Sequence, residues 1–194
     1  LLKAGSLIKD MESGNIFSDL SECEKFAEER GLGMSQTDIA ECYMALGGIP
    51  YYWRYLARNL SLAQNLDRLC FAIDAPLKGE FDELYSSLFK NAAAYKKVVS
   101  TLARKKAGMT RLELFEAMGM SATGKLSETL ETLESSGFIR SYLSYGAKKK
   151  NTVYQLIVPF SLFHFKFLEK FFLQVSWHIH RCFFPPPRYI PPDF

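Results

Sequence analysis

The sequence has few of the residues from which catalytic and metal sites are usually built. Its 194 residues include three histidines and four cysteines. The cysteines lie far apart and form no C-x-x-C pair, so we expect a reduced, cytoplasmic protein without a cysteine-based zinc site. The spacing of His164, His178 and His180 supports no Ser-His-Asp or Cys-His arrangement. His178 and His180 would share one face of an extended strand, but no set of further metal ligands lies nearby.

The chain also lacks a long uninterrupted apolar run. Residues 154–175 are rich in Phe and Leu, but a proline and several polar or charged residues interrupt them: Pro159, His164, Lys166, Glu169 and Lys170. Because a membrane-spanning helix needs about 20 mostly apolar residues, we expect a core or interface segment here and no membrane partner. The first eight residues have no long apolar core either, which argues against a signal peptide.

Charge of one sign is not in large excess. The chain has 24 Lys and Arg against 21 Asp and Glu, for a formal charge of +3 and an isoelectric point near 8.6. This mild basicity is compatible with a nucleic-acid partner, but it is far from a balance that would require one.

What the second half does contain is a series of helix start and stop signals. A helix expected over residues 91–107 has apolar side chains at helical spacing and stops at Gly108. Thr110 and Glu113 form a capping box, in which hydroxyl and carboxylate satisfy free amide donors, and this box opens a short second helix. That helix is expected to end at Gly119.

A third helix and two strands follow. Ser121 is expected to cap the helix, which Gly137 terminates. Strands are expected over residues 138–145 and 152–158, around a basic turn. Three helices and a hairpin in this order predict a winged helix-turn-helix with a two-stranded β wing.

The first half is predicted to be helical. A capping box at Ser21 opens the first helix, and Ser35 caps the second. A helix beginning at Pro50 is expected to continue to Leu69, and residues 80–90 form a strongly amphipathic helix. Between them, Gly47, Gly48 and Pro50 form a corner that is either a plain helix-to-helix connection or a surface facing a nucleotide.

Several stretches in this order resemble the prokaryotic P-loop ATPases of the archaeal-type ATPase group, a branch near the AAA+ and signal-transducing NTPases. The resembling stretches are residues 21–24, 47–53, 60–65, 79–90, 136–140 and 153–157. The similarity extends over residues 20–168. In that family an ATPase core is followed by a helical lid, a winged helix and often a nuclease-like segment, and this chain resembles the lid and winged helix only.

The resemblance implies ATP and Mg²⁺ for the parent family, but not for this chain. The sequence has no G-x-x-x-x-G-K-[ST] and no strand ending in an acidic pair, so we expect neither an enzyme nor a cofactor here. The resemblance also implies that Gly47, Gly48 and Pro50 correspond to the lid motif beside bound nucleotide. The implied partners are an ATPase core or a C-terminal nuclease-like domain.

We therefore predict a mainly α fold, with a helical lid-type bundle followed by the winged helix-turn-helix. The expected divisions are a lead-in, a lid-like subdomain, the winged helix, an aromatic helix and a Pro-rich tail, over residues 1–20, 21–78, 79–158, 159–176 and 177–194.

The charges of the third helix and of the wing bear on whether the winged helix contacts double-stranded DNA. The third helix carries one lysine against three glutamates, a net charge of −2 that opposes phosphate. Residues in its first turn and in the wing favour contact: Ser121, Thr123, Lys125, Arg140, Lys148, Lys149 and Lys150. Both duplex contact and a winged helix used for packing or partners remain open.

The function expected is a non-catalytic lid and winged-helix portion that couples nucleotide state to DNA or effector binding. The alternative is a protein-interaction, autoinhibitory or oligomerisation module without DNA binding. The aromatic residues 160–172 are expected to form a helix buried against the wing and a further C-terminal domain. Without such a domain, the same apolar surface would favour homo-oligomers.

Overall fold

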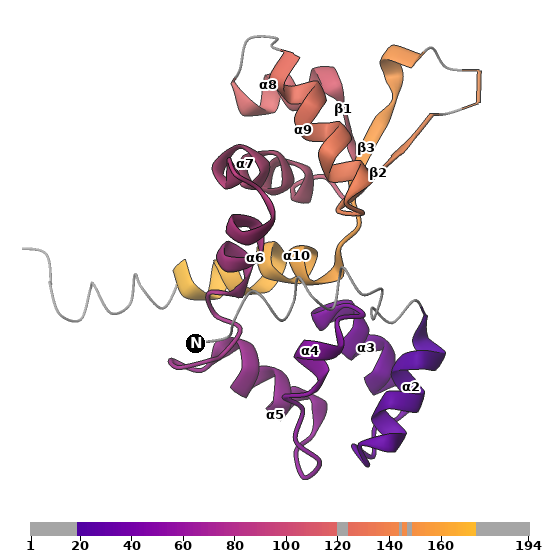
Figure 1. Ribbon diagram of the computed structural model, residues 1–194, viewed down its shortest axis with the longest axis vertical. Coiled ribbons are helices and arrows are strands. Elements are labelled where there is room, and N and C mark those ends of the chain that lie inside the picture. The colour runs from indigo at the N-terminus through magenta and orange to yellow at the C-terminus, as the bar shows by residue number, and fades with distance from the viewer. Residues whose placement is uncertain (1–18, 120–123, 144, 147–148, 174–194) are drawn as a thin grey trace, which may run out of the picture.

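The computed structural model describes residues 19–119, 124–143, 145–146 and 149–173. This part of the chain is mainly helical and contains one small antiparallel sheet of three strands (Figure 1). Its buried apolar side chains form a continuous core from Cys23 to Leu168. No helix in the described ranges is long and apolar enough to cross a membrane.

The first helices begin at hydrogen-bonded caps. They are α2 (Leu20–Glu29) and α3 (Gln36–Leu46). The predicted cap at Ser21 is wrong, because the Asp19 carboxylate accepts from the Glu22 backbone N–H at 3.0 Å and caps α2 two residues earlier. The cap at Ser35 is confirmed, with Asp38 completing a capping box.

The helix predicted to run from Pro50 to Leu69 is broken in the structure. It consists of α4 (Pro50–Trp53), a loop, and α5 (Leu62–Leu66), which continues into the π-helical turn η1 (Asp67–Phe71). Ser61 caps α5 with a capping box, so the local hydrogen bonds favour a new helix start there over continuation of the first.

The second half alternates helices with short strands. Its elements are α6 (Glu80–Leu88), α7 (Ala92–Ala103), β1 (Met109–Thr110), α8 (Arg111–Met118), α9 (Gly124–Ser135), β2 (Ile139–Tyr142), the 3₁₀ turn η2 (Lys149–Asn151) and β3 (Val153–Leu156). The capping box of Thr110 and Glu113 and the left-handed Gly119 at the end of α8 are confirmed. The prediction of a two-stranded wing is incomplete, because a third strand, β1, also pairs with β3. The strand order is β1-β3-β2.

The last helical segment packs against the first half of the chain. It comprises α10 (Pro159–Phe163) and the π-helical turn η3 (His164–Leu168), and helical backbone continues to Leu173. The Phe160 ring lies 5.1 Å from that of Tyr52, and the Ser161 and Tyr85 hydroxyl oxygens are 3.2 Å apart. The expectation that this segment packs on the wing is therefore wrong.

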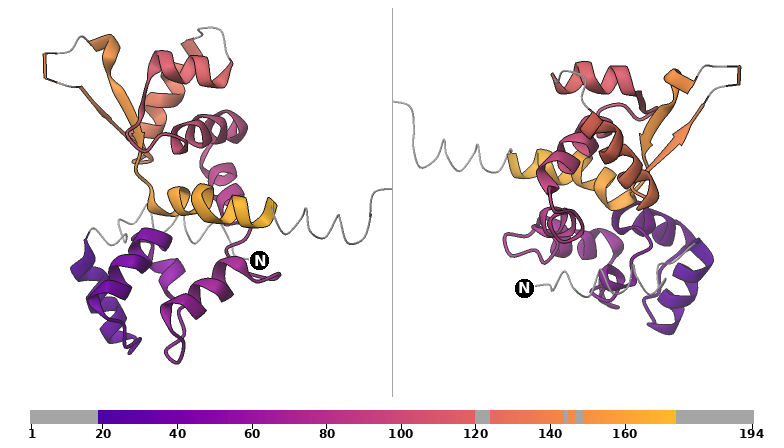
Figure 2. Two further views of the ribbon diagram at one scale, coloured as in Figure 1. Left: turned by 180° about the vertical axis from the view of Figure 1, so that it is seen from behind. Right: turned by 45° about the horizontal axis from the view of Figure 1, so that its top comes forward.

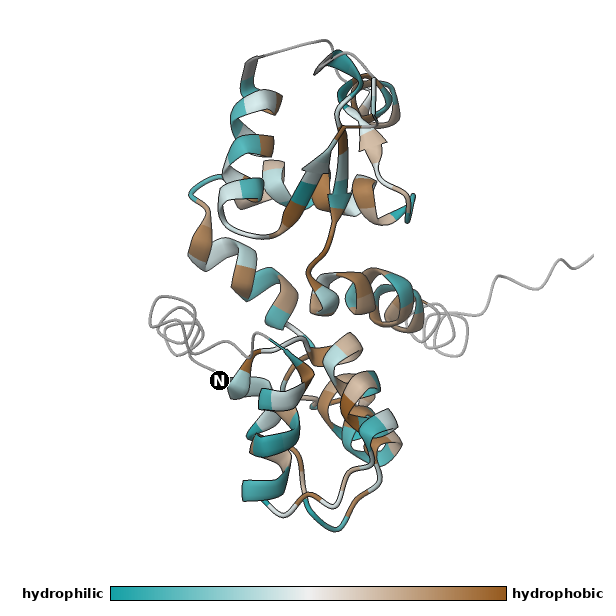
Figure 3. Cartoon of the chain, turned by 90° about the vertical axis from the view of Figure 1, so that its right-hand side faces the viewer, coloured by the Kyte–Doolittle hydropathy of each residue, from teal (hydrophilic) through white to brown (hydrophobic). Residues whose placement is uncertain are grey.

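Figures 1 and 2 show α6 and α10 crossing the middle of the molecule, between α2–α5 and the group formed by α7, α8, α9 and the sheet. The chain that enters α10 from β3 is hydrophobic (Figure 3). Cys23, Cys42 and Cys70 are buried and unpaired, as expected for small core side chains.

Candidate protein-interaction surface

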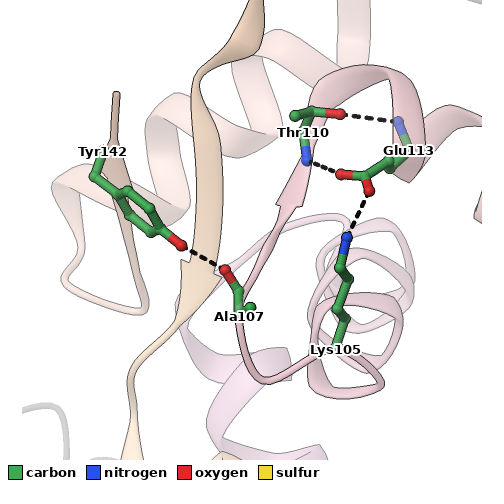
Figure 4. Close-up of polar contacts among 5 residues, drawn as sticks. All are labelled: Lys105, Ala107, Thr110, Glu113 and Tyr142. Atoms are coloured by element: carbon green, nitrogen blue, oxygen red, sulfur yellow. Dashed lines mark hydrogen bonds and ion pairs between the residues drawn. The ribbon is translucent and has the colours of Figure 1, made fainter. Parts of the chain in front are cut away.

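The β2–β3 hairpin is anchored to the loop that follows α7. The Tyr142 hydroxyl donates to the Ala107 carbonyl (Figure 4), and Gln155 Nε2 donates to the Lys106 carbonyl at 2.7 Å. Figure 4 also shows Lys105 paired with Glu113, which links α7 to the start of α8. These contacts fix the base of the hairpin relative to the helices, so its exposed residues project from a rigid support.

The free edge of the sheet is protected at β2. The Ser141 backbone N–H and hydroxyl both donate to Glu134 Oε1, at 3.2 and 2.5 Å. An outward-facing N–H that is already bonded cannot pair with an added strand. At Ser141, the β2 edge therefore offers no free backbone donor to an added strand.

The outer face of α9 is acidic. Leu126, Leu130 and Leu133 are buried on its inner face. The charged side chains exposed on the other side are Lys125, Glu128, Glu131 and Glu134. Three carboxylates against one ammonium group leave a negative surface, which repels a polyanion at short range.

Of the residues predicted to contact DNA, the structure describes only some, and two of these, Lys125 and Arg140, lie apart. Lys125 lies in the first turn of α9, whereas Arg140 follows its end and donates through Nε to Gln155 Oε1 at 2.8 Å. A helix of this length separates the two by about 15 Å, with the glutamates between them. Lys149 and exposed Lys150 belong to η2, and Ser121, Thr123 and Lys148 lie outside the described residues.

The corner of Gly47, Gly48 and Pro50 is buried. The Gly47 carbonyl accepts from Trp53 Nε1 at 2.8 Å, and a Cβ built on Gly47 would lie 3.8 Å from Cδ of Pro159. The corner thus packs against the start of α10. A left-handed φ of 70° at Gly47 explains the need for glycine by backbone geometry alone.

Two exposed apolar groups lie on the surface, and the sequence pointed only to the second of them. One is on the hairpin, where Tyr142, Leu143 and Tyr145 are exposed. They fall at and beyond the end of β2, where pairing with β3 stops, so a pattern that predicts a strand to Tyr145 treats them as part of the sheet. We call these three residues the hairpin patch.

The other group lies along α10 and η1. The Phe71 ring contacts those of Phe163 and Phe171, at centroid distances of 6.1 and 5.1 Å, and Phe163 contacts Phe167 at 5.2 Å. Phe167 and Leu173 are exposed. We call these five residues the aromatic face. The sequence indicated its apolar character, but not that Phe71 belongs to it.

Comparison with known proteins gives a limited result. No family model matches the chain, and no solved structure matches it. The chain is 27% identical over 154 residues to the vacuolar-sorting protein BRO1 of Arabidopsis thaliana, an alignment that covers 71% of this chain. It spans only 18% of the length of that relative.

These findings contradict the resemblance to archaeal-type P-loop ATPases, because the curated relative is a sorting protein and no ATPase family model matches. The expected coupling of nucleotide state to DNA binding followed from this resemblance and is also wrong. The correspondence of Gly47, Gly48 and Pro50 to a lid motif beside bound nucleotide rested on that resemblance and is withdrawn with it.

Proposed function

We propose that the chain is a protein-interaction module that binds a partner through the outer face of α9 and the hairpin patch. The succession α7, β1, α8, α9, β2, β3 supports a winged helix, used here for protein contact. We also propose that the chain has no active site of its own, since the sequence has no phosphate-binding loop.

The observation that carries this proposal is the acidic, exposed face of α9 next to an exposed aromatic hairpin. In a DNA-binding winged helix, the corresponding helix approaches phosphates, and its charge would be unfavourable here. Tyr side chains provide a large apolar contact area with a polar end, a combination enriched in protein interfaces. The matching partner is a protein surface with basic and apolar side chains. The relative's name as a sorting protein supports a role in recognition.

Reversing charge on α9 is expected to weaken binding of a basic, apolar probe. The probe is a fluorescein-labelled 12-residue peptide of alternating Lys and Leu, measured by fluorescence anisotropy in moderate salt. The double variant Glu128→Lys, Glu131→Lys should lower its affinity by about tenfold, because two attractive contacts become repulsive.

The matched control is Glu41→Lys, Glu169→Lys, which makes the same charge change at exposed positions on α3 and just after η3. It should bind like the unaltered chain. Equal affinities for all three proteins, or tighter binding of a 20-base-pair duplex than of the peptide by the unaltered chain, would refute the proposed surface.

Self-association is a second candidate function, favoured by the aromatic face. An exposed cluster of large apolar side chains is commonly covered by a partner. The variant Phe167→Ser, Leu173→Ser should shift sedimentation from dimer toward monomer at tens of micromolar protein, whereas Met44→Ser on α3, also exposed, should leave it unchanged. An unaltered chain that sediments as a monomer throughout this range excludes self-association through this face.

A further inference from the structure

Four arginines gather around the loop that joins α4 to α5. They are Arg30, which follows α2, Arg54 and Arg58 in the loop itself, and Arg68 in η1. Arg30 Nη2 donates to the Arg54 carbonyl at 3.2 Å, and Arg68 Nη2 donates to the carbonyl of the next residue, Tyr55. A Cβ built on Gly31 would lie 3.8 Å from Cζ of Arg58. We call the four residues the arginine cluster.

A buried asparagine holds this loop in place. Asn65 is 4% exposed, and its Oδ1 accepts from the Ala57 backbone N–H at 2.8 Å. Its Nδ2 donates to the carbonyls of Ala57 and Leu60, at 3.1 and 3.2 Å. Since the loop backbone is bonded at both ends, Arg54 and Arg58 extend from a fixed support, and binding would cost little ordering of the backbone.

Among the residues that the structure describes, no ion pair neutralises the charge of the arginine cluster. In the described ranges, the ion pairs within 4.0 Å are Lys96–Asp82 and Lys105–Glu113, so no carboxylate there pairs with any of the four guanidinium groups. This holds although Glu29 and Asp67 are sequence neighbours of Arg30 and Arg68. Arg54, Arg58 and Arg68 are exposed. Each guanidinium carries five N–H donors in a planar fork, and most of them have no protein acceptor here.

The surroundings favour a short anionic ligand over a long polyanion. Residues 19–73 contain five basic and eight acidic residues, so the cluster is a positive patch on a negative body. A nucleic acid would extend past the cluster onto carboxylates, whereas a short acidic segment need not. Guanidinium groups bind carboxylates and phosphoryl groups through paired, charge-assisted hydrogen bonds.

We propose that the arginine cluster binds a short acidic segment of a partner protein, one rich in carboxylate or phosphorylated side chains. The cluster lies among α2–α5, on the other side of α6 and α10 from the α9 surface (Figure 1). The inference therefore does not rest on the basic-partner surface proposed above, and either can fail alone.

The test uses the full chain and three labelled probes of similar length: a peptide of alternating Ser and Glu, the same peptide with phosphoserine, and single-stranded DNA. Anisotropy titrations in moderate salt should show binding of at least one peptide, more tightly than the DNA. Which peptide binds more tightly distinguishes a carboxylate from a phosphoryl source. The variant Arg54→Glu, Arg58→Glu should lower peptide affinity by about tenfold, because both side chains are exposed and repulsion replaces attraction.

The control Lys125→Glu, Lys150→Glu makes the same change of net charge on exposed residues of the other half, and it should alter affinity by less than about twofold. If thermal melting shows the glutamate variant to be unfolded, Arg54→Gln, Arg58→Gln takes its place, with a smaller loss expected. Absence of peptide binding, equal loss in the control, no loss in the cluster variant, or tighter binding of DNA than of either peptide would each overturn the proposal.

Discussion

Replacing Gly108 by alanine is expected to lower the free energy of unfolding by about 3 kcal/mol. Gly108 has a φ of 83°, a left-handed conformation that costs an L-residue about 1–2 kcal/mol. A Cβ there would lie 2.5 Å from the Tyr154 carbonyl oxygen and 2.8 Å from Cγ1 of Val153. Both neighbours belong to β3, so relieving the overlap has to move the backbone of the central strand, at a further cost of about 1–3 kcal/mol.

Gly119 provides the matched control. Its φ is 62°, but no atom of the described residues lies within 4 Å of a Cβ built there. Gly119→Ala should therefore show only the conformational cost, about 1 kcal/mol. Urea unfolding followed by circular dichroism measures both values. Equal losses in the two variants would mean that the close approach of Gly108 to β3 does not form.

Stability between pH 4 and 7 should depend on two buried groups that act in opposite directions. Burial raises the pKa of Glu80 to about 7, partly offset by a hydrogen bond that its Oε1 accepts from the Tyr52 hydroxyl at 3.0 Å. Burial lowers the pKa of His164 to about 4, and Asp82 opposes this shift. The His164 ring stacks on Phe81 at a centroid distance of 4.1 Å, and its Nδ1 is buried without a hydrogen-bond partner.

As the pH rises, the unfolded chain loses the Glu80 proton near pH 4.5, whereas the folded protein keeps it to about pH 7. The contribution of Glu80 to the free energy of unfolding is therefore complete below about pH 4.5 and is lost by about pH 7. His164 is neutral when folded, whereas the unfolded chain protonates below about pH 6.5, so its contribution rises from about pH 4 to pH 6.5. Each shift corresponds to about 3 kcal/mol.

Single substitutions should separate the two effects. In the variant Glu80→Gln only the histidine contribution remains. Its free energy of unfolding should therefore increase by about 3 kcal/mol from pH 4 to pH 7, whereas that of the unaltered chain should stay nearly constant. In His164→Gln the free energy of unfolding should decrease by a similar amount over the same pH range. In the double variant it should change with pH as little as in the unaltered chain. Urea midpoints measured across this range test the pair. Parallel pH profiles for all four proteins would show that neither group titrates abnormally in the fold.

Features encoded by neighbouring residues were predictable from the sequence. The box of Thr110 and Glu113, the cap at Ser35 and the stop at Gly119 depend on hydrogen bonds or dihedral angles within one turn of helix. The two hairpin strands were also found, because alternation and a turn signal identify them locally. Ser21 failed as a cap because Asp19, two residues earlier, offers the same chemistry.

Features that depend on distant residues were not predictable. Strand β1 exists because Met109 and Thr110 pair with β3, more than forty residues later. The amphipathic pattern of residues 80–90 gave no sign that Glu80 would be buried, yet it is 2% exposed beside Tyr52. The arginine cluster was missed for the same reason, since its members are brought together only when the loop after α4 folds back onto the end of α2.

The position of α10 has a consequence for synthesis of the chain. Tyr52 and Tyr85 leave the ribosome long before Phe160 and Ser161, the residues of α10 that they contact. Until α10 has been synthesised, the sides of these two rings that face it lack their partners. The nascent polypeptide must therefore hold an incompletely folded N-terminal half, and a chaperone that binds exposed aromatic residues would act during this interval.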